Sequence, residues 1–460
     1  MSQFLPWKIV NIDLRQALPN LQADAETGGL FVVFWQGDVP VGQWLAPAQL
    51  LPIGSVQLAS IAAQRVARAV GHGLIKKGYP RPPFFLSPEV RSGPGLASLL
   101  EFARPLQSFS ELARPPKSCE TGITAPVSVI ICTRNRPEAL QKCLQSLRNL
   151  ARRPREIIVV DNDPSSNLTP SVAAQFAEVR YIPEPRAGLS AARNSGIRNA
   201  TSDIIAFTDD DVSVHPAWIA AILRAFENPC VMALTGTVLP AELSTAAQFA
   251  FQSEALGWEL GFEGYEVLDF DSEFFRDTTH LGVPVWRMGA GANMAFRRAA
   301  FDHVGVFDER LGAGTSGCSE DSELWYRLLA EGYRCRYDPS VVVSHFHRSD
   351  WPELAQQTYS YMRGHIAALL FQFDRYHHWG NLKRAFGVLP LYFMKLALRS
   401  LKKAVIRILI NSDQDQPALA SPLGQKIRGM LAGYVYYLQH RHLPANPASN
   451  LNTGNHHVRT

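Results

Sequence analysis

Three consecutive carboxylates, Asp209, Asp210 and Asp211, directly follow a short apolar run. Like charges this close raise one another's pKa, so the group needs a cation or hydrogen-bond donors beside it. No Lys or Arg stands within several residues of the triplet. Because side chains alternate along a strand, Asp209 and Asp211 should share one face and Asp210 the other. Two carboxylates on one face suit Mg²⁺ or Mn²⁺, and the alternative is a solvated acidic turn.

A second acidic pair, Glu320 and Asp321, stands at the start of an apolar-periodic helix. Acids in a first turn complement the helix dipole and Ser319 can cap the helix, so a purely structural role is the alternative. His345 and His347 follow an apolar strand with the spacing that puts both on one side. Neutral imidazole is a good ligand for Mn²⁺ and a poorer one for Mg²⁺, whereas ordinary strand-end histidines need no metal.

The composition is that of a large folded protein. With 460 residues, 46% of them hydrophobic and 19% charged, the chain is long enough for more than one domain. A net charge of +4 is too small to indicate nucleic-acid binding. The six cysteines form no CxxC pair, and no signal peptide or apolar run of membrane-spanning length is recognisable. We therefore expect a reduced, cytoplasmic protein.

The hydrophobic pattern changes along the chain. Residues 30–45 predict a β-hairpin and residues 57–77 a helix, whereas from Val127 short apolar runs alternate with helical patterns. Such alternation indicates βαβ units whose ligands bind beyond the carboxyl ends of the strands, which brings Thr133, Asp161 and the triplet to one rim. We expect an N-terminal α+β region of unknown role (1–104), a linker (105–126), an α/β domain (127–348), a helical C-terminal region (349–445) and a disordered tail (446–460).

Seven segments carry a resemblance to a known family. In order, they are PVSVIICTRNRP, IIVVDNDPS, EPRAGLSAARNSGI, IIAFTDDDV, GANMAFRRAAFDHVGVFDERLG, SEDSELWYRLLAEGY and VVVSHFHR. Together they resemble the family 2 inverting glycosyltransferases, whose GT-A fold is Rossmann-like, with a mostly parallel central sheet flanked by helices. The resemblance covers residues 127–348. It implies metal-dependent transfer of a sugar from a nucleoside-diphosphate sugar, UDP- or dTDP-linked, to an acceptor hydroxyl in polysaccharide or glycolipid synthesis.

The resemblance also assigns residues to three groups. The nucleotide-binding group is Thr133, Arg134, Asn135, Asp161, Arg186, Gly188, Arg193 and Asp209. The donor-sugar group is Asp210, Gly291 and Asn293, and the ligands of the Mn²⁺ or Mg²⁺ ion are Asp211 and His345. The catalytic group is the acidic pair, in which Asp321 takes the hydroxyl proton and Glu320 stands beside it. For Arg186 and Arg193 ion pairing is the alternative account, and for Asp161 it is a turn or helix cap.

Two further segments bear on partners. Residues 386–410 mix apolar and basic side chains, as in a helix that lies on an anionic membrane, or in a helix that packs on the catalytic domain with a solvated basic face. Residues 312–317 match GxGxxG but lack the preceding apolar strand of a dinucleotide site, so we expect a mobile loop. The expected partners are a nucleoside-diphosphate sugar and a hydroxyl acceptor, either glycan or lipid-linked, and not nucleic acid. If residues 386–410 bind lipid, the protein lies on the inner face of the cell membrane.

Two other functions remain open at this level. A nucleotidyltransferase also uses a nucleotide and a metal ion on a similar sheet, but it releases pyrophosphate rather than a nucleoside diphosphate. A non-catalytic carbohydrate-binding or scaffold protein could retain the fold without turnover.

Overall fold

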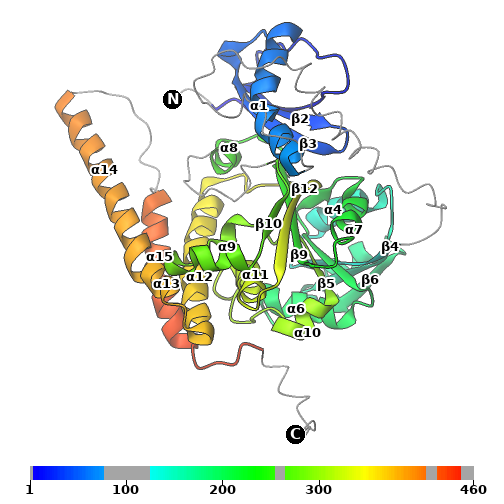
Figure 1. Cartoon of the computed structure of the whole chain (residues 1–460), viewed down its shortest axis with the longest axis vertical. Helices are drawn as coiled ribbons and strands as arrows, with labels where there is room; N and C mark the ends of the chain where they lie inside the picture. The colour runs from blue at the N-terminus through cyan, green and yellow to red at the C-terminus, as the bar shows by residue number, and fades with distance from the viewer. Residues whose placement is uncertain (1–3, 77–124, 254–264, 411–421, 447–460) are drawn as a thin grey trace, which may run out of the picture.

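The computed structural model describes residues 4–76, 125–253, 265–410 and 422–446 (Figure 1). The expected linker lies outside the described residues except for its last two positions, and so does the expected tail beyond residue 446. The expected α/β domain is described throughout, apart from residues 254–264.

Within the described residues, a nine-stranded sheet forms the centre of the molecule. Its order is β10-β12-β9-β11-β7-β4-β5-β6, and β8 pairs with β12. The strands are β4 (Ala125–Thr133), β5 (Pro154–Asp161), β6 (Val179–Pro183), β7 (Ile204–Asp209), β8 (Val212–Val214), β9 (Val231–Pro240), β10 (Leu268–Phe270), β11 (Asn293–Arg297) and β12 (Arg334–His345). The expected parallel arrangement holds from β6 to β7. Beyond β7 the sheet is mixed, because β11 is antiparallel to both of its neighbours.

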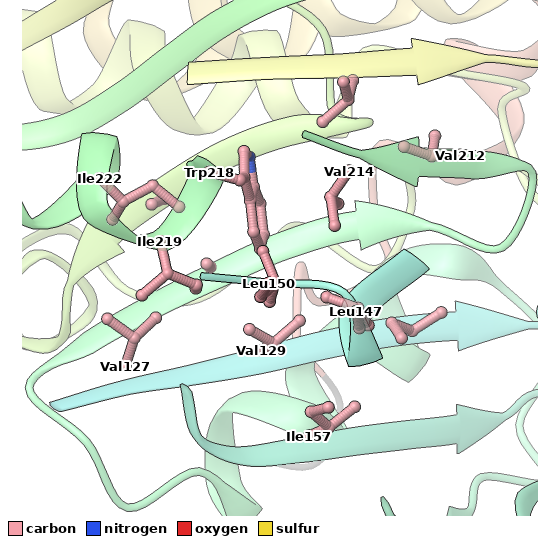
Figure 2. Packing of buried hydrophobic residues seen from close by; sticks show 14 of the residues in the cluster. Val127, Val129, Leu147, Leu150, Ile157, Val212, Val214, Trp218, Ile219 and Ile222 are labelled. Atoms are coloured by element: carbon pink, nitrogen blue, oxygen red, sulfur yellow. The ribbon is translucent and has the colours of Figure 1, made fainter. Parts of the chain in front are cut away.

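Helices cover both faces of this sheet. They are α4 (Pro137–Arg148), α5 (Thr169–Ala173), α6 (Leu189–Asn199), α7 (Trp218–Ala225), α8 (Ala246–Gln252), α9 (Ser272–Thr278), α10 (Arg298–Val304) and α11 (Glu320–Ala330). On one face, Trp218 of α7 packs among Val127, Val129 and Val214 (Figure 2). On the other face, Trp325 of α11 joins a second buried cluster. These two cores fix the strand ends that carry the acidic residues.

The N-terminal residues form a small sheet of β1 (Trp7–Asp13), β2 (Gly29–Gln36) and β3 (Val39–Pro47), followed by α1 (Ser55–Lys76). The predicted hairpin is present as β2 and β3, whereas β1, which pairs in parallel with β2, was not predicted. Phe31 and Val33 pack against Leu239 and Val342, near the carboxyl ends of β9 and β12. The small sheet is therefore attached to the rim of the central sheet at which ligands are expected.

Helices make up the described C-terminal part. They are α12 (Trp351–Tyr376), α13 (Trp379–Lys383), the π-helix η7 (Arg384–Val388), α14 (Leu389–Ile410) and α15 (Pro422–His440). Ile366 and Met362 of α12 share a buried cluster with Met430 of α15. Helix α14 runs out from the body of the molecule along one side (Figure 1). Within the described residues, we find no helix that combines the length and the apolar character needed to cross a bilayer.

Candidate active site

A cavity of about 950 Å³ opens at the carboxyl rim of the central sheet. Its walls come from the central sheet and its loops, from β3 of the N-terminal sheet and from α12. The sequence-predicted residues that line it are Thr133, Arg134, Arg193, Asp209, Asp210, Asp211, Gly291, Glu320, Asp321 and His345. The fold therefore brings the triplet and the acidic pair, more than 100 residues apart in sequence, to one cavity.

A buried arginine on α6 connects the two acidic groups. Arg193 donates a hydrogen bond of 2.6 Å to Glu320 and a longer one of 3.4 Å to Asp209. It also donates to the carbonyl of Gly291 at 3.3 Å. Burial raises the pKa of Glu320 and Arg193 opposes this effect. Arg193 is 2% exposed, so these contacts form a buried ion pair and not one at the surface; they hold Glu320 in place, so it is not the free carboxylate of the pair.

Asp321 is that free carboxylate. Its Oδ1 accepts hydrogen bonds from the backbone and the hydroxyl of Ser322 at 2.6 and 3.2 Å. Its Oδ2 makes no hydrogen bond to any described residue and faces Gly291, where an added Cβ would stand 3.1 Å away. The same Cβ would stand 2.8 Å from Arg193, so only glycine leaves this space open. An acceptor hydroxyl entering it would meet an unpaired carboxylate oxygen.

The expected cap of helix α11 is corrected by the structure. Ser319 precedes Glu320 with a left-handed φ of +74° and makes no side-chain cap hydrogen bond. Its hydroxyl instead lies 3.0 Å from the Cys318 sulfur. A non-glycine residue in this conformation is uncommon, and it sets the direction in which the acidic pair enters the cavity.

The acidic triplet has an arginine beside it after all. Arg136 was not singled out from the sequence, yet it donates to Asp210 at 3.1 Å and to Asp211 at 3.0 Å. Asp210 is buried and also accepts from Thr133 at 2.7 Å. Burial and the charge of Asp211 raise the pKa of Asp210 to about 6. Asp210 is thus tied to the loop after β4, and in this structure its oxygens point to protein donors rather than to a sugar.

Asp211 and His345 approach each other as the resemblance requires of metal ligands. Their Oδ1 and Nε2 atoms are 3.3 Å apart, close to the roughly 3 Å that separates neighbouring corners of an octahedron around Mg²⁺. Burial would raise the pKa of Asp211, but the hydrogen bond with His345 and the charge of Arg136 lower it. No cluster of three or more His, Cys, Asp or Glu that could hold a metal ion is assembled among the described residues. Asp211 and His345 could supply two ligands to a divalent ion, which would take the rest of its shell from phosphate oxygens and water.

A chain of hydrogen bonds sets the tautomer of His345. The Nε2 of His347 lies 3.0 Å from the side-chain oxygen of Gln252, so this nitrogen donates. Burial lowers the pKa of His347 to about 3, which keeps the ring neutral and its Nδ1 free of a proton. That Nδ1 lies 3.0 Å from Nδ1 of His345, which must therefore donate. Burial lowers the pKa of His345, but the hydrogen bond with Asp211 and its charge raise it further, so without a metal ion the ring holds a second proton on Nε2, which donates to Asp211. When that proton leaves, the proton on Nδ1 is kept by His347 and the lone pair appears on Nε2.

Five predicted residues do not line the cavity: Asn135, Asp161, Arg186, Gly188 and Asn293. Asn293 is a correction, because it is fully buried and accepts from Trp218 while donating to the carbonyls of Thr237 and Val341. It is a core residue that joins three strands to α7. The sequence could not distinguish it, because an Asn beside glycines suits a sugar site equally well.

The other four lie outside the cavity lining and make their own contacts. Arg186 pairs with Glu184 and Glu309, which matches its ion-pair alternative. Asp161 is buried and accepts from Tyr181 at 2.9 Å and from the backbone of Asp163 at 3.1 Å. The remaining two, Asn135 and Gly188, both have positive φ. The Asn135 amide donates to Asp163, and Gly188 is the N-cap residue of α6.

The loop of residues 312–318 is held on both sides. The carbonyl of Ala313 accepts from Leu189, at the start of α6. Arg363 of α12 donates to the carbonyls of Thr315 and Ser316 at 2.7 and 2.6 Å. An added Cβ at Gly364 would stand 2.5 Å from the carbonyl of Cys318, so loop and helix touch through backbone. The loop that precedes the acidic pair is fastened to α12.

Comparison with known proteins agrees with this arrangement. The family model described as Glycosyl transferase family 2 matches residues 128–305. The chain contains a family 2 glycosyltransferase domain. The matched part carries the acidic triplet and Arg193, and it ends before the acidic pair.

Relatives of the domain differ in what they glycosylate. A pre-mycofactocin glycosyltransferase of Mycobacterium tuberculosis is 28% identical over 229 residues, which are 49% of this chain and 44% of that protein. The succinoglycan biosynthesis protein ExoM of Rhizobium meliloti is 28% identical over 232 residues, 48% of this chain and 66% of that protein. The chain spans about half the length of the curated relatives it matches. Among solved structures, the mannosyltransferase PcManGT of Pyrobaculum calidifontis, determined with GDP-Man and Mn²⁺, aligns over 74% of this chain and 96% of its own, with a TM-score of 0.44 and 16% identity.

Proposed function

We propose that the protein is a metal-dependent inverting glycosyltransferase that moves a sugar from a nucleoside-diphosphate sugar to an acceptor hydroxyl, in polysaccharide or glycolipid synthesis. One observation carries the proposal. The unpaired Oδ2 of Asp321 opens into the same cavity as the Asp211–His345 pair. A base for the incoming hydroxyl and ligands for the leaving diphosphate are the two requirements of a single displacement.

The residues of the chain divide the work. Asp321 takes the proton of the attacking hydroxyl, while Arg193 and Glu320 hold the start of α11 in place. Arg136 and Arg348, the latter 3.7 Å from Asp211, bring positive charge to the side of the cavity on which a diphosphate would lie. A Mn²⁺ or Mg²⁺ ion bound by Asp211 and His345 would supply further charge to stabilise the leaving nucleoside diphosphate. Asp209 is placed to meet the ribose, because it lies on the same rim with a third of its side chain exposed.

The donor nucleotide is proposed to be UDP or dTDP, because a carboxylate accepts the imide N–H of uracil or thymine. Asp161, the residue assigned by resemblance, is buried under Tyr181, so base binding there requires the tyrosine to move. Asp163 is the more exposed carboxylate at this rim and lies beside Arg134 and Asn135. Asp161→Asn and Asp163→Asn should each reduce UDP binding if its carboxylate contacts the base.

The test of the activity starts from donor binding. A thermal-shift screen of nucleoside-diphosphate sugars with Mn²⁺ and with Mg²⁺ should find a donor that raises the melting temperature only with metal present. Turnover of that donor should release a nucleoside diphosphate. Release of pyrophosphate would instead identify a nucleotidyltransferase, and no turnover of any donor would identify a non-catalytic protein.

We also propose a peripheral contact with anionic membranes through α14. Exposed apolar residues recur on this helix at the spacing of one face, namely Leu391, Met394, Leu398 and Leu401. The basic residues among them include Lys395, Arg399 and Lys402, and the helix contains no acidic residue. Leu389 and Phe393 join the buried cluster with α12, and Leu396 packs against it. The exposed apolar face does not match a helix that packs fully on the catalytic domain.

Vesicle binding tests this contact. The protein should sediment with phosphatidylcholine vesicles that contain phosphatidylglycerol and less with pure phosphatidylcholine. Leu398→Glu with Leu401→Glu should abolish sedimentation, whereas Val56→Glu, at an exposed apolar position on α1, should not. Equal binding by the double variant would exclude α14, and self-association without vesicle binding would assign the face to a second copy of the chain.

A further inference from the structure

One part of the cavity lining has a different composition from the acidic end. We call it the distal wall and define it as Gln43, Trp286, Gln356, Gln357, Ser360 and Tyr361. Gln43 comes from β3, Trp286 from the 3-10 helix η6 (Val285–Arg287), and the other four from α12. The distal wall thus joins the N-terminal sheet and the C-terminal helices around one space.

No member of the distal wall is charged. Among the described residues, four arginines line the cavity: three of them, Arg136, Arg193 and Arg348, pair with the acidic triplet or with Glu320, and Arg134 lies 3.7 Å from Asp163. His365 lies beside the distal wall. Burial, and to a smaller extent the charge of Arg384, lowers its pKa to about 3, so this ring is neutral as well. A phosphate at the distal wall would find no guanidinium or ammonium group among the six residues of that wall, and Glu353, one turn earlier on α12, adds a negative charge to the cavity lining.

The groups that the distal wall does offer suit hydroxyls. Gln357 donates to the Tyr361 hydroxyl at 2.8 Å, which orients its amide and leaves the carbonyl oxygen to accept. The oxygen of Gln43 accepts from Tyr265 at 2.9 Å, which leaves its NH₂ group to donate. Side-chain amides both donate and accept, as a sugar hydroxyl does, and aromatic rings cover the apolar face of a pyranose. Neutral amides with rings therefore favour a saccharide.

The ring of Trp286 is held in position by two neighbouring side chains. The Arg384 guanidinium of η7 stacks on it with its carbon 3.9 Å from the ring centre. His365 of α12 meets the same ring edge to face, with 4.8 Å between centroids. A ring fixed on two sides loses little freedom when a sugar packs on it, which is the usual benefit of a preorganised site.

We propose that the distal wall binds the acceptor and that this acceptor is an uncharged saccharide rather than a lipid phosphate. The inference rests on the proposed function and names the acceptor class of the same site. In the reaction, a bond forms between the saccharide oxygen and C1 of the donor sugar. The bond from C1 to the diphosphate oxygen breaks, the hydroxyl proton passes to Oδ2 of Asp321, and the nucleoside diphosphate leaves with the bond's electron pair.

Binding without turnover provides the first test. The full chain is applied, without donor, to an array of uncharged oligosaccharides and to immobilised dodecyl phosphate and undecaprenyl phosphate. We expect retention on at least one uncharged glycan, with a loss of at least about tenfold in affinity for Gln43→Ala and for Gln357→Ala. Gln64→Ala, at an exposed position on α1, and Gln141→Ala, on α4, are matched controls that should bind as the parent does. Retention on phosphates alone, or on glycans regardless of Gln43 and Gln357, would overturn the proposal.

Kinetics separate this inference from the proposed function. With the donor found by thermal shift, the bound glycan should increase release of nucleoside diphosphate above the rate of donor hydrolysis. The acceptor KM should rise in Gln357→Ala and in Trp286→Ala, with recovery in Trp286→Phe, and stay unchanged in Gln64→Ala. Gln-dependent glycan binding with no turnover of any donor would defeat the proposed function and retain the distal wall as a glycan site. Turnover stimulated only by dodecyl phosphate would support the proposed function and exclude the distal wall as the site of an uncharged acceptor.

Discussion

The two ends of the cavity differ in the charge of the side chains that line them. One end carries the acidic triplet, the acidic pair and the arginines of the lining, and many of these charges are paired within the protein, as in Arg193 with Glu320 and Arg136 with Asp211. At the other end the distal wall is neutral and consists of amides, hydroxyls and rings. Apart from Trp286, the distal wall comes from residues outside the part that matches the family model.

The difference indicates how the parts of this chain share the reaction. The charged end, where the proposed diphosphate and metal ion would bind, lies largely within residues 128–305, the part that matches the family model. The groups proposed to select the acceptor come mostly from β3 and α12. Variants at the two ends should consequently fail in different ways.

The largest effect is expected at the free carboxylate of the charged end. Asp321→Asn should lower kcat by about 10²- to 10⁴-fold, because no other described group takes the hydroxyl proton. Nucleotide binding in the presence of Mn²⁺ should persist, as measured by thermal shift. Asp302→Asn, at an exposed position on α10, is the control and should retain full turnover. Normal turnover by Asp321→Asn would show that another group accepts the proton of the acceptor hydroxyl.

The next effect concerns the buried pair that joins the acidic groups. Arg193→Met should cost about 3–5 kcal/mol in the free energy of unfolding, because Glu320 is left buried and unpaired. The double variant Arg193→Met, Glu320→Met should recover much of that stability in urea unfolding without recovering turnover. Arg180→Met removes an exposed pair with Glu156 and should cost only about 0–1 kcal/mol. Equal losses for Arg193→Met and Arg180→Met would contradict the assigned role.

A smaller effect should follow from the residue behind the metal ligand. His347→Phe keeps a ring against Phe251 but removes the acceptor that orients His345. We expect the affinity for Mn²⁺ alone to fall about 10- to 100-fold, as measured by titration calorimetry. His280→Phe, at an exposed position, should leave the affinity unchanged. Unaltered Mn²⁺ binding in His347→Phe would mean that His345 needs no orientation or is not a ligand.

The smallest effect is a pH dependence beside the neutral end. The pKa of His365 is lowered from its ordinary 6.5 to about 3 by burial and by Arg384. The unfolded chain therefore binds a proton that the folded chain does not, and stability present above pH 6.5 is lost as the pH falls toward 3. The expected slope from this residue is about 1.4 kcal/mol per pH unit. In urea unfolding at pH 7, 6 and 5, the free energy of unfolding of His365→Asn should depend on pH less steeply than that of the parent. The control His280→Asn should show the same pH dependence as the parent.

The spacing of apolar residues was sufficient to predict an element wherever burial of one face alone determines its secondary structure. The stripe Leu140, Cys143, Leu144 and Leu147 predicted α4, and all four residues are buried there. The rule that parallel strands share a ligand-binding rim predicted that Thr133 and the triplet would meet, as they do, whereas the acidic pair was assigned to the same site by the family resemblance. Neither argument needs knowledge of which side chains touch.

Sequence reasoning failed where a side chain's partner comes from a distant segment. Arg136 is 75 positions before Asp211, so only the folded chain reveals that it neutralises the triplet. Asn293 looked like a sugar contact until its three core partners were visible. Gln43 lies in a region without any recognised motif, and β3 reaches the cavity only because Phe31 and Val33 anchor the small sheet on the large one.

The hydrogen bonds between loop 312–318 and α12 set the minimum length of a fragment that keeps the site intact. Arg363 and Gly364 hold the backbone from Thr315 to Cys318, and Asp321 follows three residues later. A fragment cut at residue 305, where the match to the family model ends, would lack Asp321, the proposed proton acceptor, and one strand of the central sheet. A fragment extended only to the end of β12 would regain Asp321, but the preceding loop would keep its contact with Leu189 and lose its hydrogen bonds from Arg363. A working fragment has to include α12.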